Sequence, residues 1–312
     1  MTESFHDPVM VAEVMDLLAP GPDKTVLDGT LGGGGHSEAL LRGGLGRLIG
    51  LDRDDEALAR AGERLAAFGD RAVIRKSDFA EMGAALDGLG IETVDGILLD
   101  LGVSRHQLTA GHRGFSLRQD GPLDMRMDPA AGETAAELLA RLSEREIADL
   151  LFSLGEEPAS RRIAREIAAR RKAGQPARTT AELRAAVEKA AGTGRPGHIH
   201  PATRTFMALR IAVNDELGRL DRALAEIPGR LKPGGRAVVI SYHSLEDRRV
   251  KTSFAGEAKG CDCPPQFPVC VCGKKPRLKL LTRKAAVPTP AEVETNPAAR
   301  SAKLRAAERL ET

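Results

Sequence analysis

The sequence predicts an α/β fold: a largely parallel sheet with helices on both faces, and an inserted all-helical domain. Short apolar runs alternate with helical patterns over the first hundred residues, as in strand–helix–strand units. A cluster of glycines follows the first of these runs, where such sheets bind ligands. Strand patterns stop near residue 105 and return after residue 200. We therefore expect a core of residues 1–104 and 201–312 and a helical domain of residues 105–200.

The N-terminal part of the core supplies four predicted strands. They are short apolar runs, at residues 26–28, 47–52, 71–76 and 96–101. A helix begins at Ser37, directly after the glycines. A second helix is expected over residues 54–68, because its apolar residues recur every three or four positions.

The inserted domain shows only helical periodicity. Four helices are expected in it, near residues 134–142, 144–154, 159–172 and 180–191. Ser143 followed by Glu146 resembles a capping box, and Thr180 followed by Glu182 resembles a helix start.

After residue 200 the core resumes. One long helix or a helix pair is expected over residues 203–231, followed by a turn at 232–235 and a strand at 236–241. A last strand at residues 278–282 and a basic helix at residues 298–310 complete the prediction.

The composition is that of an ordinary globular protein, with 42% hydrophobic and 29% charged residues. No apolar run approaches the ~20 residues that span a bilayer, and the N-terminus lacks a secretory signal pattern. We therefore expect a cytoplasmic protein without a membrane partner. Residues 1–104 hold 9 basic and 19 acidic residues, whereas residues 105–240 hold 23 and 17. This asymmetry predicts a polyanion-facing surface beyond residue 104, with ordinary solvated faces as the alternative.

The glycines Gly32 to Gly35 lie between a strand and a helix start, and three kinds of nucleotide site could use them. The P-loop motif G-x-x-x-x-G-K-[ST] is absent. The dinucleotide motif G-x-G-x-x-G fails because its last position is Ser37 or Glu38. S-adenosylmethionine has no phosphate and needs only a close approach of the backbone, which glycine permits. We therefore expect S-adenosylmethionine here, with a purely structural turn as the alternative.

Two acidic positions strengthen this prediction. Asp52 ends the second strand, where it can bind the ribose hydroxyls. Asp78 and Phe79 follow the third strand, where they can contact the adenine.

Longer strings make the pattern specific. They include Gly34-Gly35-His36-Ser37, Asp52-Arg53-Asp54, Asp100-Leu101-Gly102-Val103-Ser104, Pro122-Leu123-Asp124-Met125-Arg126-Met127, His200-Pro201-Ala202-Thr203-Arg204, Ser241-Tyr242-His243-Ser244 and Asn296-Pro297-Ala298-Ala299-Arg300. With them the chain resembles the RsmH (MraW) family of bacterial 16S ribosomal RNA (cytosine-N4)-methyltransferases. It departs from the family pattern at Gly33 and at Tyr242, where Phe is frequent.

The resemblance implies a class I (Rossmann-like) methyltransferase core with S-adenosylmethionine as its cofactor. It implies methylation of the N4 amine of a decoding-centre cytidine, in a small ribosomal subunit or a late assembly intermediate. A homodimer is left open. The cofactor-binding positions that carry over are Gly34, Gly35, His36, Asp52, Phe79, Asp100 and Gln107.

The N4 amine is a poor nucleophile because its lone pair is delocalised into the ring. The D/N-P-P-[YFW] loop of DNA amino-methyltransferases is absent after the fourth strand, and Asp262-Cys263-Pro264-Pro265 follows the wrong strand to replace it. Asp100 is predicted to orient the amine, with a cofactor contact as the alternative. His243 is predicted to accept the proton, with a structural role as the alternative.

A basic helix is predicted to contact RNA phosphates, with a plain solvated helix as the alternative. Its basic residues are Arg161, Arg162, Arg165, Arg170, Arg171 and Lys172. Ile163 and Ile167 should face inward. The aromatic residues that could stack on an extruded cytosine, or be core, are Phe115, Phe206 and Tyr242.

No metal is predicted at the methyl-transfer site. Cys261, Cys263, Cys270 and Cys272 form a C-x-C-x6-C-x-C pattern, which fits either a zinc site or reduced free thiols. Two other functions stay open: a non-catalytic ribosome-assembly factor that retains the cofactor fold, and a methyltransferase of DNA or of a small molecule.

Overall fold

The computed structural model describes residues 8–103, 110–194, 200–264, 267, 269 and 271–311. The chain divides into two compact units, one formed by Met1–Gly102 with Gly218–Thr312 and the other by Val103–Leu217. The second boundary lies later than the expected one at residues 200/201. The physical reason is that Phe206 and Leu209 belong to the apolar core of the second unit.

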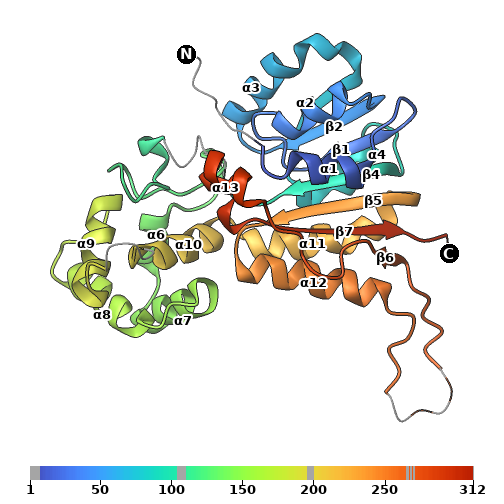
Figure 1. Ribbon diagram of the computed structural model, residues 1–312. Coiled ribbons are helices and arrows are strands. Elements are labelled where there is room, and N and C mark those ends of the chain that lie inside the picture. The colour runs from blue at the N-terminus through green and yellow to red at the C-terminus, as the bar shows by residue number, and fades with distance from the viewer. Residues whose placement is uncertain are drawn as a thin grey trace. The chain divides into compact units, whose positions relative to one another are not determined.

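The first unit is built on a seven-stranded sheet of order β3-β2-β1-β4-β5-β7-β6 (Figure 1). Its strands are β1 (Thr25–Asp28), β2 (Arg47–Asp52), β3 (Ala72–Lys76), β4 (Val94–Asp100), β5 (Leu231–Ser241), β6 (Leu278–Leu280) and β7 (Lys303–Arg309). Strands β1 to β5 are parallel, and β7 runs antiparallel to β5 and β6. The predicted α/β sheet is thus confirmed. Its strand order reverses between β1 and β4, the place where doubly wound sheets form their ligand crevice.

Successive strand residues bury on opposite faces, as the pleat requires. The helices that flank the sheet are α1 (Val11–Leu18), α2 (Gly35–Arg42), α3 (Asp55–Leu65), α4 (Met82–Asp87), α11 (Glu216–Arg230) and α12 (Ser244–Ala258). Leu27 and Leu99 pack on one face with α4, α11 and α12, whereas Val26 and Leu98 pack on the other with α1, α2 and α3. Short elements complete the unit, namely η1 (Ala66–Arg71), η2 (Phe79–Glu81), α13 (Pro290–Thr295) and η4 (Pro297–Ser301).

The basic helix predicted over residues 298–310 is wrong, because residues 303–309 form strand β7. Its alanines and charged residues favour a helix as an isolated segment. In the fold, however, β7 pairs with β5 on one side and β6 on the other. Small side chains suit that place, since Ala306 and Ala307 are fully buried on opposite faces. The pairing overrides the local preference.

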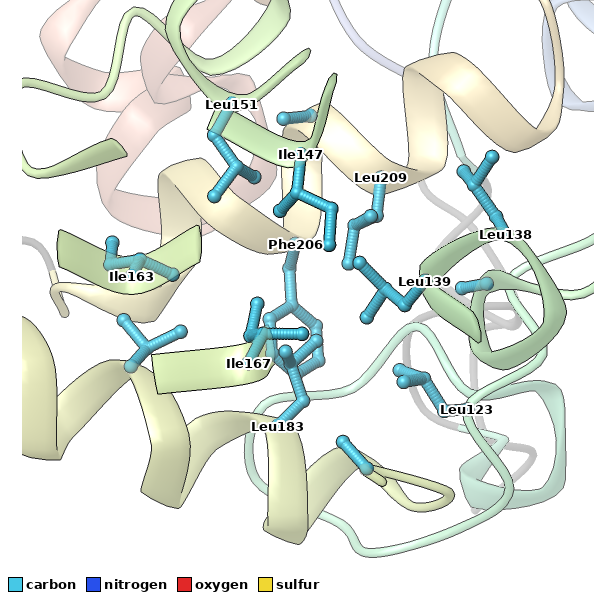
Figure 2. Packing of buried hydrophobic residues seen from close by; sticks show 14 of the residues in the cluster. Leu123, Leu138, Leu139, Ile147, Leu151, Ile163, Ile167, Leu183, Phe206 and Leu209 are labelled. Atoms are coloured by element: carbon cyan, nitrogen blue, oxygen red, sulfur yellow. The ribbon is translucent and has the colours of Figure 1, made fainter. Parts of the chain in front are cut away.

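The described residues of the second unit form helices, a short η3 turn (Gly111–Arg113) and no strand. The helices are α6 (Ala135–Arg141), α7 (Glu144–Gly155), α8 (Ser160–Lys172), α9 (Thr180–Ala191) and α10 (Ala202–Val213). The Ser143 capping box is confirmed, but α9 is capped by Thr179 and not by Thr180. The core includes Ile163 and Ile167, which face inward as predicted (Figure 2). Within the described parts of both units, no helix has the length and apolar character to cross a membrane.

Candidate functional site

Three aspartates end neighbouring strands of the first unit. Asp28 ends β1, Asp52 ends β2 and Asp100 ends β4. Because these strands are parallel and adjacent in the order β2-β1-β4, their carboxyl ends lie at one edge of the sheet. That edge, at the reversal of strand order, is where the sequence predicted the cofactor.

The glycine turn after β1 is braced by Asp52. The backbone N–H of Gly32 donates to Asp52 Oδ2 at 2.8 Å, and the N–H of Asp54 donates to Oδ1 at 2.9 Å. Gly32 and Gly34 have φ values of +51° and +77°, in the left-handed region that favours glycine. Gly34 is the N-cap of α2, and Gly35 and His36 open that helix. The turn thus presents backbone at the end of β2, as a bulky phosphate-free ligand requires.

Burial raises the pKa of Asp52 to about 6, against the hydrogen bonds from Asp54 and Gly32, which lower it. A carboxyl group with this pKa is ionised at neutral pH but poorly solvated. It therefore gains most from further hydroxyl donors, such as the two hydroxyls of a ribose.

Asp28 has a different task. It is 2% exposed, and it accepts hydrogen bonds from the Ser37 hydroxyl at 2.7 Å and from the Thr30 N–H at 3.2 Å. Burial raises the pKa of Asp28, while the Ser37 hydrogen bond and the nearby His36 oppose the rise. Both acceptor oxygens are used within the protein, so Asp28 ties the start of α2 to the end of β1.

Asp100 is held by two hydrogen bonds. Its N–H donates to Thr30 Oγ1 at 2.6 Å, and its Oδ1 accepts from the Tyr242 hydroxyl at 2.8 Å. Burial and the charge of Asp100 raise the pKa of Tyr242, so the phenol stays protonated and donates. Asp100 Oδ2 lies 3.7 Å from His36 Nδ1, beyond hydrogen-bond range. Within the described part of the chain, Oδ2 accepts no hydrogen bond, so its lone pairs are left for a ligand donor.

His36 is buried and shares this corner of the site. Its Nε2 lies 2.8 Å from the carbonyl oxygen of Val9, which can only accept. The ring therefore donates from Nε2 to that carbonyl oxygen, and its Nδ1 faces Asp100 Oδ2.

The two residues predicted to contact the adenine, Phe79 and Asp78, have different surroundings. Phe79 is half-buried and packs against the core beside Leu99. A Cβ on Gly29 would lie 2.6 Å from Leu99 Cδ2 and 3.0 Å from Phe79 Cβ, so Gly29 lets this close packing occur. Asp78 is buried, caps η2 through the Ala80 N–H and pairs with Arg219 and Arg53. Gln107 lies outside the described residues.

His243 is the N-cap of α12. Its Nδ1 accepts from the Glu246 N–H at 3.4 Å, while Glu246 Oε2 accepts from the backbone N–H of His243 at 3.3 Å and of Tyr242 at 2.9 Å. The Nδ1 lone pair is thus used on the helix, and the buried Nε2 lies 3.3 Å from Glu246 Oε1. This geometry favours the structural alternative for His243, and its role as proton acceptor stays a prediction.

The six basic residues of α8, in the second unit, do not share one environment. Arg171 Nη1 donates to three carbonyl groups at the end of α6, those of Leu139, Ala140 and Leu142. Arg170 pairs with Glu166 of its own helix. The four remaining side chains are exposed, and no ion pair links them to the described residues: Arg161, Arg162, Arg165 and Lys172.

Two of the three aromatic candidates are core residues. Phe115 and Phe206 are 6% and 5% exposed, and Figure 2 shows Phe206 within the cluster of the second unit. Tyr242 is bound to Asp100 by its hydroxyl. Thr30, which accepts from the Asp100 backbone N–H, was not among the site residues predicted from the sequence. The only feature that pointed to Thr30 was its position between Asp28 and the glycines.

The arrangement fits a nucleoside ligand without phosphate. Left-handed glycines bring the backbone close, Asp52 offers a carboxylate for hydroxyl groups, and Asp100 has an oxygen, Oδ2, that no described donor binds. No basic residue lies within the turn from Asp28 to Gly35, so a phosphate group would have no side-chain cation there.

Comparison with known proteins agrees with this geometry. Residues 3–310 match the model of the MraW methylase family. The "Ribosomal RNA small subunit methyltransferase H" of Heliobacterium modesticaldum is 53% identical over 98% of this chain and 98% of its own length. The protein of the same name from Geotalea uraniireducens is 50% identical over 99% and 100%. A solved rRNA methylase from Streptococcus thermophilus aligns over 100% of this chain and 99% of its own at 12% identity, with a TM-score of only 0.44.

Sequence identity of about half extends over 98–99% of this chain and 98–100% of these two relatives. The chain belongs to the MraW methylase family, and its first unit has the doubly wound α/β sheet described above.

Proposed function

We propose that this protein transfers a methyl group from S-adenosylmethionine to the N4 amine of a cytidine in 16S ribosomal RNA of the small subunit. The coarser part, a small-subunit rRNA substrate, is supported by the name shared by relatives at 50–53% identity. The finer part is supported by one observation above all: Asp100 is fixed by Thr30 and Tyr242, and no donor among the described residues binds its Oδ2. A single fixed acceptor is what an amino group needs for orientation.

S-adenosylmethionine supplies a methyl group on a positively charged sulfur. The protein's own residues bind the cofactor and the RNA, orient the reacting atoms and exclude water from them. Asp52 and the backbone at Gly32 to Gly35 hold the nucleoside and amino-acid parts. Asp100 Oδ2 accepts a hydrogen bond from one N4–H, which turns the nitrogen lone pair toward the methyl group. On transfer N4 would gain the methyl group, the departing sulfur would keep the electron pair of its bond to carbon, and the proton that N4 loses would pass to a base, for which His243 is the predicted candidate and solvent is the alternative.

His243 provides a test of where that proton goes. We expect His243→Asn to keep turnover within about threefold, since Asn is a good N-cap and preserves the contact with the Glu246 N–H. A direct proton-acceptor role would instead cost roughly 10²-fold in kcat and remove a titration near neutral pH. Single-turnover rates from pH 6 to 9 separate the two roles.

The exposed basic residues of α8 are proposed to contact RNA phosphates. Arg161, Arg165 and Lys172 lie within about 40° of one another around the helix, on a face opposite to the buried isoleucines. Arg171 serves the helix packing and is left out of the surface.

We expect Arg161→Gln/Arg165→Gln to weaken rRNA binding roughly tenfold and to lower the slope of log K against log salt by about 1.5. Affinity for S-adenosylmethionine and thermal stability should not change. Arg145→Gln is the matched control, because Arg145 is also exposed on a helix of the second unit but pairs with Asp149. An equal loss of binding free energy per charge removed, two in the double variant and one in the control, would mean that net charge alone, and not this face, drives binding.

Mass spectrometry of 16S rRNA from a deletion strain tests the proposal. We expect one cytidine to lose one methyl group and a plasmid copy of the gene to restore it. In vitro, naked 16S rRNA, assembly intermediates and complete small subunits should be compared as substrates. Cofactor binding without a methylated product would favour the alternative, a non-catalytic assembly factor. A methyl group lost from DNA but not from rRNA would overturn the proposal.

A further inference from the structure

The connection between α12 and β6 has no apolar core of its own. None of its described residues between Lys259 and Arg277 is buried. Its larger apolar side chains, Phe267, Val269 and Val271, are 50%, 70% and 74% exposed. A segment of this length that buries nothing needs another source of order. Figure 1 shows the connection in orange, between α12 and β6.

Three cysteine sulfurs meet in this connection. The Sγ atoms of Cys261, Cys263 and Cys272 all lie within 4.8 Å of one another. Those of Cys261 and Cys272 are 3.7 Å apart. Two thiolates bound to one tetrahedral zinc ion at ~2.3 Å are about 3.8 Å apart. The Cys261 and Cys272 sulfurs therefore already have the spacing of zinc ligands, and Cys263 Sγ lies within 4.8 Å of both. Cys270 lies outside the described residues.

Each of these sulfurs also accepts a backbone N–H. The N–H of Cys263 donates to Cys261 Sγ at 3.3 Å, that of Val271 to Cys263 Sγ at 3.3 Å, and that of Asp262 to Cys272 Sγ at 3.5 Å. A neutral thiol is a weak acceptor, whereas a thiolate is a strong one. Hydrogen bonds of this kind fix the direction of a metal ligand and stabilise its negative charge. Three of them aimed at three neighbouring sulfurs indicate a site prepared for thiolates.

The charge of the connection suits the same purpose. It contains four cations, Lys259, Lys274, Lys275 and Arg277, and a single acidic residue, Asp262. A zinc ion with three or four thiolates carries a net negative charge, which neighbouring cations offset.

We propose that Cys261, Cys263 and Cys272 bind a zinc ion that holds this connection in its folded form. The ion is structural and separate from the methyl-transfer site. Removing it unfolds the connection and leaves the sheet intact.

Metal analysis of the full-length protein tests the proposal. Protein purified in a thiol-free reductant without chelator should hold about one zinc per chain. Cys263→Ser should bind less than about a tenth of that, whereas Asp262→Asn, which changes the residue between two ligands, should bind as the wild type does. Cobalt(II) alone, added to the zinc-free protein, should give the intense visible and near-ultraviolet bands of tetrahedral thiolate ligation, and Cys263→Ser should lack them.

A second measurement follows the fold of the connection. Trypsin should cleave after Lys274 at least tenfold faster once zinc is removed, with the folded sheet resistant. The proposal fails if the reduced wild type takes up neither zinc nor cobalt, or if Cys263→Ser takes them up equally. It also fails if a Cys261–Cys272 disulfide, and not a metal, accounts for the protease resistance.

Discussion

Replacing Asp100 by Ala should abolish methyl transfer, with a fall in single-turnover rate of roughly 10³-fold at saturating S-adenosylmethionine. The reason is geometric. Asp100 Oδ2 is the fixed acceptor at the carboxyl end of β4, and no described hydrogen bond occupies it. Without it, the amine keeps its lone pair in the ring and is not turned toward the methyl group.

Two milder variants grade this effect. Asp100→Asn keeps an oxygen for the Tyr242 hydroxyl but offers an amide N–H to the substrate, so its rate should lie near that of Ala. Tyr242→Phe leaves the carboxylate and removes only the 2.8 Å hydrogen bond that holds Oδ1. The loss of one hydrogen bond of about 1.4 kcal/mol corresponds to a rate reduction of about tenfold.

Calorimetry on the same variants separates catalysis from cofactor binding. If Asp100 orients the amine, the Kd for S-adenosylmethionine should change by less than about fivefold in all three. If Asp100 only contacts the cofactor, the Kd should rise instead and the rate at saturation should recover. That second pattern would contradict the proposed role.

The sheet and its three aspartates could be predicted from the sequence, because both depend on local patterns. Short apolar runs followed by Asp28, Asp52 and Asp100 place the carboxylates at strand ends, and parallel neighbours bring those ends together. The glycines at positive φ were likewise marked by residue type. What each carboxylate does could not be predicted. Both carboxylate oxygens of Asp28 accept hydrogen bonds, one of them from Ser37. Among the described residues, Asp100 accepts through Oδ1 alone, from Tyr242, which is distant in sequence.

The errors have a common physical source, which is partners far away in the chain. Strand β7 has the composition of a helix and becomes a strand only because β5 and β6 supply its hydrogen bonds. The pattern of α8 identified Ile163 as inward-facing, but it could not show that Arg171 binds the end of α6. Phe206 was compatible with base stacking until its place in a buried cluster was known.

Replacing Asp52 by Asn should weaken binding of S-adenosylmethionine about 100-fold at pH 7.5. Two charge-assisted hydrogen bonds to the ribose are lost, worth about 3 kcal/mol together. Asp55→Asn is the matched control, because Asp55 is three residues away, exposed and paired only with Lys76. The control should bind as the wild type does, in an isothermal titration of each protein.

The pH dependence gives the sharper test, because the pKa of Asp52 is about 6 in the free protein. Hydroxyl donors favour the ionised form, so binding lowers this pKa and releases a proton below pH 6. Wild-type affinity should therefore be constant from pH 7 to 8 and fall about fivefold between pH 6 and 5. Asp52→Asn should show no such fall, and an unchanged profile would remove Asp52 from the cofactor site.

Ionisation of Asp52 should lower the free energy of unfolding of the ligand-free protein, although it raises the affinity for S-adenosylmethionine. Its folded-state pKa of about 6 lies above the ordinary value of 3.8, so ionisation disfavours the folded, ligand-free protein. Its contribution to the free energy of unfolding is fully present below pH 4 and declines by about 3 kcal/mol as the pH rises through 6. Denaturant unfolding of wild type and Asp52→Asn at pH 5 and 7.5 should show that the decline is smaller in the variant. Excess S-adenosylmethionine should stabilise the wild type more than the variant at pH 7.5, since the hydroxyl groups that bind the carboxylate are also those that stabilise its charge.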